Sequence, residues 1–359
     1  MSQRKTAAFF LFAVCCRLLF VFLFPPQGTD HEMLHTAVDN LLNGHGLGFT
    51  IAHAQDLSST QFLPFTDWPP LIAYLLAATK ALTGSKTAAD LLLMSAGIVF
   101  LLLVIRAILQ SLHIKPVVQA LIWVVIATNP EPFRLLGLTD LYGSLFLMWS
   151  ILFCIRFINQ PYIRTAQLLT AAVFFFLPAA FRYQYYPIIF ISPLFLMAAA
   201  RLTGNKHLQQ RSALALSVVF VLFAAQIMLL VQQGGSAAHI ADDAAGFYPA
   251  HLLRMHPFLF KAFVNTSYIE TSIFMIMKPA LAHYFAAATV VTAGLLMLTA
   301  VHLYQKLRLL PQQPNTAALT LARSLLFTIG IANVVLLCIL ATRYAAQPGT
   351  DGGSFTYVK

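Results

Sequence analysis

The chain has 359 residues, of which 59% are hydrophobic and only 9% are charged. Ordinary soluble domains carry about 25% charged residues, so a soluble fold could not cover this much apolar surface, and lipid has to be the solvent for most of it. The net charge of +10 does not indicate nucleic-acid binding, because the basic residues fall singly between apolar segments and form no basic stripe.

Nine apolar segments are predicted to cross a membrane as helices, which makes the expected fold class an all-α integral membrane protein with 1–359 as a single domain. The first segment follows Arg4 and Lys5 without a small-residue cleavage site after it, so we interpret it as an uncleaved span. Several segments are shorter than the roughly 20 residues that an untilted span needs, which leaves their bounds approximate. The predicted spans are 7–24, 88–109, 117–129, 141–158, 167–181, 187–200, 212–232, 279–301 and 320–342.

The segment 25–87, between the first two spans, is predicted to be an external loop with surface helices of its own. Leu34, Val38 and Leu41 repeat at helical spacing, as in a helix that lies on a membrane surface. The two glycines that follow are expected to end this helix. The thirteen residues of the apolar stretch 71–83 fall in the length range of an interfacial or re-entrant segment, so we place it on the outer surface; if it crossed the bilayer, every later loop would change sides.

Basic and acidic side chains are distributed differently between the two sides of the membrane in this topology. With 71–83 on the surface, the basic residues of alternate connections fall on one side and all twelve acidic residues fall on the other. The positive-inside rule makes the basic side cytoplasmic. Acidic residues contribute little to orientation, so their sorting indicates an extracytoplasmic active site, although longer outer loops, including 233–278, would also explain it. The basic residues are Arg106, Lys115, Arg156, Arg164, Arg201, Lys206, Arg211, Lys306 and Arg308.

Three acidic residues are candidates for catalysis on that outer side. Asp30 and Glu32 stand directly beyond the first span, and Asp140 stands where the span 141–158 begins. Acidic residues close to a membrane are functional candidates by default. The alternative for each is that it caps a helix or favours its positive end.

Four further residues are candidates for substrate binding. Arg182, Tyr185 and Tyr186 follow the span 167–181, and Arg343 repeats the arrangement near the tail. An arginine at the outer end of a span can bind a phosphate. The alternative for the tyrosines is an aromatic belt at the membrane interface.

The residues His31-Glu32-Met33-Leu34-His35 match the H-E-x-x-H pattern of zinc metalloproteases. Val38 and Leu41 occupy the positions where the longer metzincin pattern requires glycine and histidine. A third ligand would have to come from a distant part of the chain. A membrane metalloprotease is therefore an alternative, and no residue is assigned as a metal ligand from the sequence.

The order of these features resembles the GT-C membrane glycosyltransferases, in particular the bacterial relatives of protein O-mannosyltransferases and of the lipid A aminoarabinose transferase. The resemblance covers about residues 1–200; beyond that it is a matter of hydropathy. The segments that carry it are Asp30, Asn40-Leu41-Leu42-Asn43-Gly44-His45-Gly46, Trp68-Pro69-Pro70-Leu71, Leu82-Thr83-Gly84, Asn129-Pro130, Leu138-Thr139-Asp140 and Arg182-Tyr183-Gln184-Tyr185-Tyr186.

The resemblance implies a GT-C-like helix bundle in the bacterial inner membrane. It implies an inverting transferase that moves a hexosyl or pentosyl group from a polyprenyl-phosphate sugar to a glycan, lipid or protein acceptor. Asp30 would match the catalytic aspartate and Asp140 the second acidic position, although this chain has Asp30-His31-Glu32 where relatives often have Asp-Glu. Arg182 would stabilise the leaving phosphate.

The partners implied are the lipid-linked donor, the acceptor and membrane lipids, with no nucleic acid. The resemblance requires no cofactor, and it leaves open whether a divalent metal ion takes part. GT-C relatives usually continue through more spans, so we expect the chain to be truncated. A transporter or lipid flippase is the alternative outside enzymes, but transporters place ionisable groups at mid-membrane and often repeat their halves. Here Arg17 is the one ionisable residue deep in a predicted span, and no halves repeat.

Overall fold

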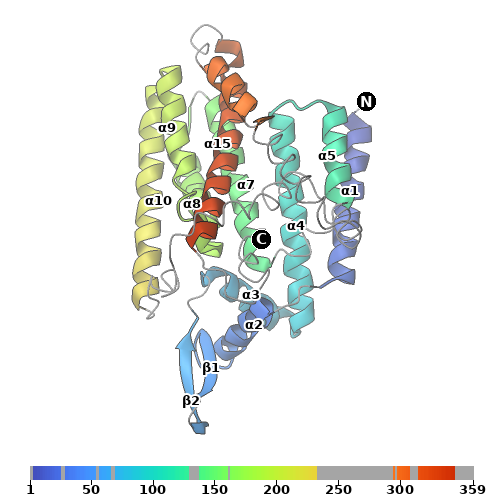
Figure 1. Ribbon diagram of the computed structural model, residues 1–359, viewed down its shortest axis with the longest axis vertical. Helices are drawn as coiled ribbons and strands as arrows, with labels where there is room; N and C mark the ends of the chain where they lie inside the picture. Colours follow the sequence, from blue (N-terminus) through green and yellow to red (C-terminus); the bar gives the residue numbers. More distant parts are fainter. Residues whose placement is uncertain are drawn as a thin grey trace. The chain divides into compact units, whose positions relative to one another are not determined.

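In the computed structural model, the described part of the chain is helical apart from one β-hairpin (Figure 1). The residues described are 3–25, 29–53, 56–65, 69–128, 137–160, 162–232, 294–295, 297–307 and 314–343. They fall into two units, Met1–His239 and Ile240–Lys359, and each unit is described by itself.

Four helices of the described part are long and apolar enough to cross a membrane. They are α1 (Gln3–Leu23), α4 (Lys86–Ser111), α7 (Leu138–Asn159) and α10 (Lys206–Gln232). Large apolar side chains stand exposed along α1, α4 and α10, for example Phe12, Phe100 and Phe220, each more than half exposed. Water disfavours so much contiguous apolar surface, whereas lipid accepts it. The chain is therefore a membrane protein.

Three shorter helices complete the bundle of the first unit: α5 (Pro116–Thr128), α8 (Thr165–Phe181) and α9 (Ile191–Thr203). Helix α1 packs on α5 and α4, α4 packs on α7, α7 packs on α8 and α9, and α10 packs on α8 and α9. Aromatic side chains fill several of these contacts. Trp123 of α5 meets Phe10 of α1 edge-on with 5.1 Å between ring centroids, and Phe146 of α7 stacks on Phe181 of α8 at 5.2 Å.

Arg17 lies fully buried between α1 and α5. Its guanidinium donates a hydrogen bond to the backbone carbonyl of Ile126 in α5. The guanidinium carbon also lies 5.5 Å from the ring centroid of Phe20, within the range of a cation–π contact. These contacts join two neighbouring helices, which is a structural role for the ionisable residue deepest in the first predicted span.

The segment between α1 and α4 forms a helix, a hairpin and a second helix. Helix α2 (Thr29–Leu42) ends as predicted, because Gly44 and Gly46 follow it with positive φ values of 81° and 91°. Strands β1 (Gly48–His53) and β2 (Asp56–Pro64) pair antiparallel, with Gly48 opposite Pro64. The side-chain amide of Asn40 donates to the carbonyl of Gly48 at 2.8 Å, so the hairpin is attached to the helix that precedes it.

Helix α3 (Leu71–Thr83) begins directly after Pro70 and ends at Gly84. Gly84 has φ 67° and donates its N–H to the carbonyl of Lys80, a left-handed helix end that favours glycine. Helix α3 packs against α2 and α4 and also touches α8. It lies with α2 and the hairpin at the lower end of the bundle in Figure 1, so the short helix predicted from the sequence covers one end of the bundle.

Each predicted span up to residue 232 corresponds to one helix, and the span 320–342 falls within α15 (Pro314–Arg343) of the second unit. Nine membrane crossings are not shown, because four described helices have the necessary length and composition. The predicted span 279–301 lies mostly outside the described residues, although 297–307 is helical. The predicted loop 233–278 lies wholly outside them. The β-hairpin is an addition to the all-α class that was not predicted.

A labelling experiment on α4 tests the predicted orientation. Thr87 and Gln110 are exposed residues near the two ends of this 26-residue helix, which is about 39 Å long at 1.5 Å per residue. Each is replaced singly by cysteine in a chain whose four native cysteines are removed. We expect Thr87→Cys to react with an impermeant thiol reagent on intact cells and Gln110→Cys to react only after permeabilisation. The reverse pattern would show that the end covered by α3 faces the cytoplasm.

Candidate functional site

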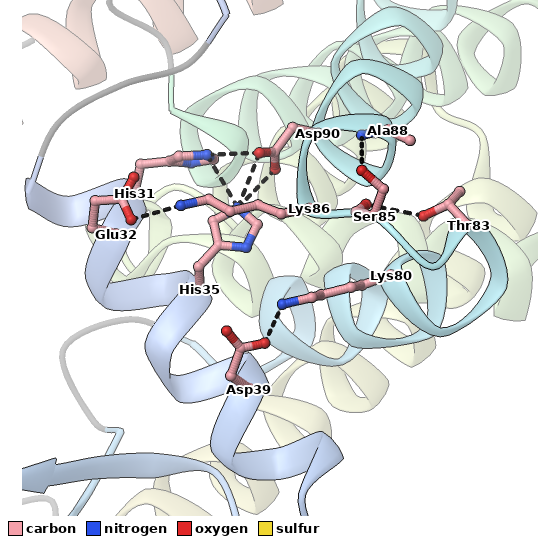
Figure 2. Close-up of polar contacts among 10 residues, drawn as sticks. All are labelled: His31, Glu32, His35, Asp39, Lys80, Thr83, Ser85, Lys86, Ala88 and Asp90. Atoms are coloured by element: carbon pink, nitrogen blue, oxygen red, sulfur yellow. Dashed lines mark hydrogen bonds and ion pairs between the residues drawn. The ribbon is translucent and has the colours of Figure 1, made fainter.

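Two imidazoles of α2 and one carboxylate of α4 converge at the end of the bundle that α3 covers (Figure 2). His35 Nε2 lies 2.9 Å from Asp90 Oδ1 and 3.1 Å from His31 Nε2, and His31 Nε2 lies 3.0 Å from Asp90 Oδ2. All three side chains are buried. Among the described residues, no other group of three histidine, cysteine or acidic side chains converges closely enough to hold one metal ion.

Local sequence explains most of this arrangement. The two histidines are four residues apart on α2, so their side chains lie on the same face of the helix. Lys86 and Asp90 have the same spacing on α4. The left-handed turn at Gly84 and the cap at Ser85, whose Oγ accepts the N–H of Ala88 at 3.4 Å, begin α4. Its first turns consequently present Lys86 and Asp90 to α2 (Figure 2).

Two ion pairs flank the cluster. Lys86 Nζ of α4 lies 2.6 Å from Glu32 Oε2, and Lys80 of α3 pairs with Asp39 of α2. The hydrogen bond from Lys86 and its positive charge lower the pKa of the Glu32 carboxyl, which makes Glu32 a weaker base. Ion pairs that solvent reaches contribute little to stability; these two join α2 to α4 and to α3.

The donor set of the cluster suits a divalent transition metal. Zinc binds imidazole nitrogen and carboxylate oxygen at about 2.0–2.2 Å, so two ligand atoms of one tetrahedral ion lie roughly 3.3–3.6 Å apart. The observed separations of 2.9–3.1 Å lie slightly below that spacing, so binding of an ion would move the three ligand atoms slightly apart. The metal-free alternative is a hydrogen-bonded cluster with Asp90 as the shared acceptor. Asp90 was not among the predicted site residues, although an acid in the first turns of an apolar span is a signal by itself.

A second polar cluster joins α7 to the segment after α8. Arg182 Nη1 lies 2.8 Å from Asp140 Oδ1 and donates to Thr139 Oγ1 at 3.2 Å. Gly137 is the N-cap of α7, so Asp140 lies within the first helical turn and is not the cap. Asp140, a predicted catalytic residue, and Arg182, a predicted binding residue, therefore meet in one ion pair. A guanidinium has five N–H donors, and both of these contacts use Nη1.

The tyrosines beside Arg182 are packed and not arranged as an open belt. Tyr185 is buried, and its hydroxyl lies 3.2 Å from Ser144 Oγ of α7. Tyr186 packs edge-on against Phe223 of α10 with 5.0 Å between ring centroids. Burial raises the pKa of the Tyr186 phenol, so it stays a neutral hydrogen-bond donor. Its hydroxyl oxygen is buried without a hydrogen-bond partner in the described structure.

The remaining predicted residues are placed by their backbone alone. Asp30 is the second residue of α2, directly before His31, and Arg343 is the last residue of α15. Their side chains lie outside what the structure describes. Of the predicted catalytic residues, Asp140 thus meets a predicted binding residue, whereas Glu32 meets Lys86, which was not predicted. The signal for Lys86 would have been its spacing of four residues from Asp90.

Gly143 controls how closely Tyr185 approaches α7. A Cβ at this position would lie 2.6 Å from Tyr185 Cε2 and 3.7 Å from Arg182 Cβ. Overpacking of this kind typically costs about 1–3 kcal/mol, so we expect Gly143→Ala to lower the midpoint of thermal unfolding in detergent. Gly330→Ala is the control, since nothing described lies within 4 Å of its Cβ and alanine favours a helix. Equal midpoints for both variants would contradict the close packing of Tyr185 on α7.

Comparisons with models of known protein families, with curated protein sequences and with solved structures gave no match. The resemblance to GT-C transferases is therefore carried only by the residues quoted for it in the sequence. The two polar clusters, and the chemistry that their side chains can perform, are the structural indications of what the chain does.

Proposed function

We propose that the chain is a membrane glycosyltransferase that moves a sugar from a polyprenyl-phosphate donor to an acceptor on the extracytoplasmic face. The donor tail would stay in lipid beside the apolar helices, while its phosphate and sugar reach the end of the bundle covered by α3. The order of motifs in the sequence and the packing of α3 on α2, α4 and α8 support this proposal.

The observation that carries the proposal is the position of Arg182. Its guanidinium stands at the end of α8, half-buried and held by Asp140 and Thr139. Tyr142, two residues after Asp140 in the first turns of α7, donates to the carbonyl of Leu93 in the first half of α4 at 3.1 Å, so the arginine lies toward the end of the bundle where α4 meets α2. A guanidinium with one nitrogen fixed can still offer its other N–H groups to a phosphate.

The reaction needs two kinds of group. The acceptor hydroxyl or amine attacks the anomeric carbon, the bond from that carbon to the phosphate oxygen breaks, and polyprenyl phosphate leaves with the bonding electrons. Arg182 would stabilise the negative charge that develops on this leaving group. The acceptor proton passes to a carboxylate, for which we propose Asp30 at the start of α2. Attack opposite the leaving group inverts the anomeric carbon, as in other single displacements.

A membrane metalloprotease is the second candidate, because His31 and His35 do converge with a third potential ligand, Asp90. A zinc protease would also need Glu32 to activate a metal-bound water. Glu32 is instead 65% exposed and paired with Lys86, which directs the carboxylate away from that task and weakens it as a base. The buried contacts of Arg17 likewise favour a structural role over transport.

The first test is the base. Membranes that contain the protein are supplied with radiolabelled polyprenyl-phosphate sugars, one at a time. General bases typically contribute about 10²–10⁴-fold to a rate, so we expect Asp30→Asn to lose nearly all transfer while still binding the lipid-linked sugar. Asp39→Asn, the same change about two and a half turns nearer the end of α2, should keep most of the activity. Full transfer by Asp30→Asn would exclude Asp30 as the base.

The second test is the cation. Losing a charge-assisted contact costs about 1.5–3 kcal/mol, or roughly ten- to a hundredfold, so Arg182→Ala should lower kcat/KM for the donor by this factor and affect the acceptor less. Arg211→Ala is the matched control, since Arg211 bonds Thr165 at the opposite end of α8. In Arg182→Ala alone, the buried Asp140 carboxylate would lose Arg182 as its partner, which is costly. The double variant Arg182→Ala/Asp140→Asn removes that negative charge as well. Unchanged donor kinetics in folded variants would leave Arg182 a structural residue.

A further inference from the structure

We propose that His31, His35 and Asp90 bind one divalent transition-metal ion of the zinc class, which holds the first turns of α2 against the start of α4. This metal site does not depend on the proposed transferase activity. It rests on three potential ligand atoms, His31 Nε2, His35 Nε2 and an Asp90 carboxylate oxygen, that all lie within 4.8 Å of one another.

The mutual contact of all three groups favours a shared ion over a purely hydrogen-bonded cluster. Without a metal, both Nε2 atoms would need hydrogens directed at Asp90, and the two N–H groups would stand side by side with their nitrogens 3.1 Å apart. Both nitrogens also lie 3.0 Å from the same Asp90 Oδ2. An ion placed between the three atoms replaces both hydrogens and accepts a lone pair from each ligand.

The charge of the three-residue cluster also favours a bound cation. As metal ligands, two neutral imidazoles and one carboxylate would carry a net charge of −1, and all three residues are less than 9% exposed. Buried charges are paired or coordinate a metal. The nearby cation, Lys86, forms its own ion pair with the Glu32 carboxylate. A divalent ion would neutralise Asp90 and leave one positive charge for a further ligand.

The donor atoms select the class of metal. Imidazole nitrogen suits zinc, iron, copper and nickel, whereas magnesium and calcium take oxygen ligands almost exclusively. Three protein ligands leave a position of a tetrahedral zinc ion open, and a water or an anionic oxygen would fill it. Because His31 directly follows Asp30, the ion would also fix the helical turn on which Asp30 stands.

The test measures bound metal and needs no activity. The full chain is purified in detergent through an affinity tag without histidines, loaded with Zn²⁺, desalted and analysed by elemental mass spectrometry. We expect one zinc per chain, and background amounts in His35→Gln and Asp90→Asn. Both replacements keep a side chain that can form hydrogen bonds, so a merely hydrogen-bonded cluster would tolerate them better than a metal site. His45→Ala, which removes an exposed histidine outside the cluster, and Asp39→Asn are the controls and should keep the ion.

Two further measurements on the unmodified chain keep the proposal testable if a variant fails to fold. Zn²⁺ should raise the midpoint of thermal unfolding and a chelator should reverse the rise, whereas Mg²⁺ should leave the midpoint unchanged. Co²⁺ should give visible absorption bands of a nitrogen- and oxygen-ligated ion, and Zn²⁺ should remove them. Absence of bound zinc together with an unchanged midpoint would overturn the site, as would equal zinc in the wild type, His35→Gln and Asp90→Asn. Bound zinc in a chain without transferase activity would support the metal site and count against the proposed function alone.

Discussion

Lipid offers no hydrogen bonds, so a polar group on an apolar helix has to find its partner inside the protein. Arg17 donates to the carbonyl of Ile126, Asp90 meets the two histidines of α2, and Asp140 meets Arg182. Each of these contacts joins two elements that are distant in the sequence. The requirement to satisfy a few polar groups thus helps to decide that α1 lies beside α5, that α2 covers the start of α4, and that the segment after α8 returns to α7.

The need for polar groups to find partners inside the protein also determines which side chains are brought together at the two polar clusters. Side chains that satisfy one another in a dry environment are held in fixed geometry, and in such an environment their electrostatic effect is larger than in water. Helix α3 is central to this because it is short, begins after Pro70 and ends at Gly84 in a left-handed turn. It packs against both α2 and α4. The buried cluster of His31, His35 and Asp90 joins α2 to α4, and the two flanking ion pairs join α2 to α4 and to α3.

The Arg182 cluster has a different structural origin, in small residues that let helices approach. Gly143 leaves room for the Tyr185 ring on α7, and Gly97 lets α4 approach α7, where a Cβ would lie 2.7 Å from Leu141 Cδ2. Close packing of this kind is common between membrane helices, since small residues allow backbones to come together. It fixes the backbone on either side of Arg182 and Asp140, and their ion pair therefore has little freedom to move.

Much of the fold could be predicted from the sequence. Apolar length located a helix for each predicted span up to residue 232, and glycines and prolines located the ends of α2 and α3, because helix formation and helix ends depend on neighbouring residues. The shared face of His31 and His35 also followed from their spacing. The β-hairpin was not foreseen, and neither was Asp90 as the partner of the two histidines nor the pairing of Arg182 with Asp140. Only the tertiary structure decided these, because a periodic pattern shows which side chains share a face of one helix, while the packing of separate helices determines which faces meet.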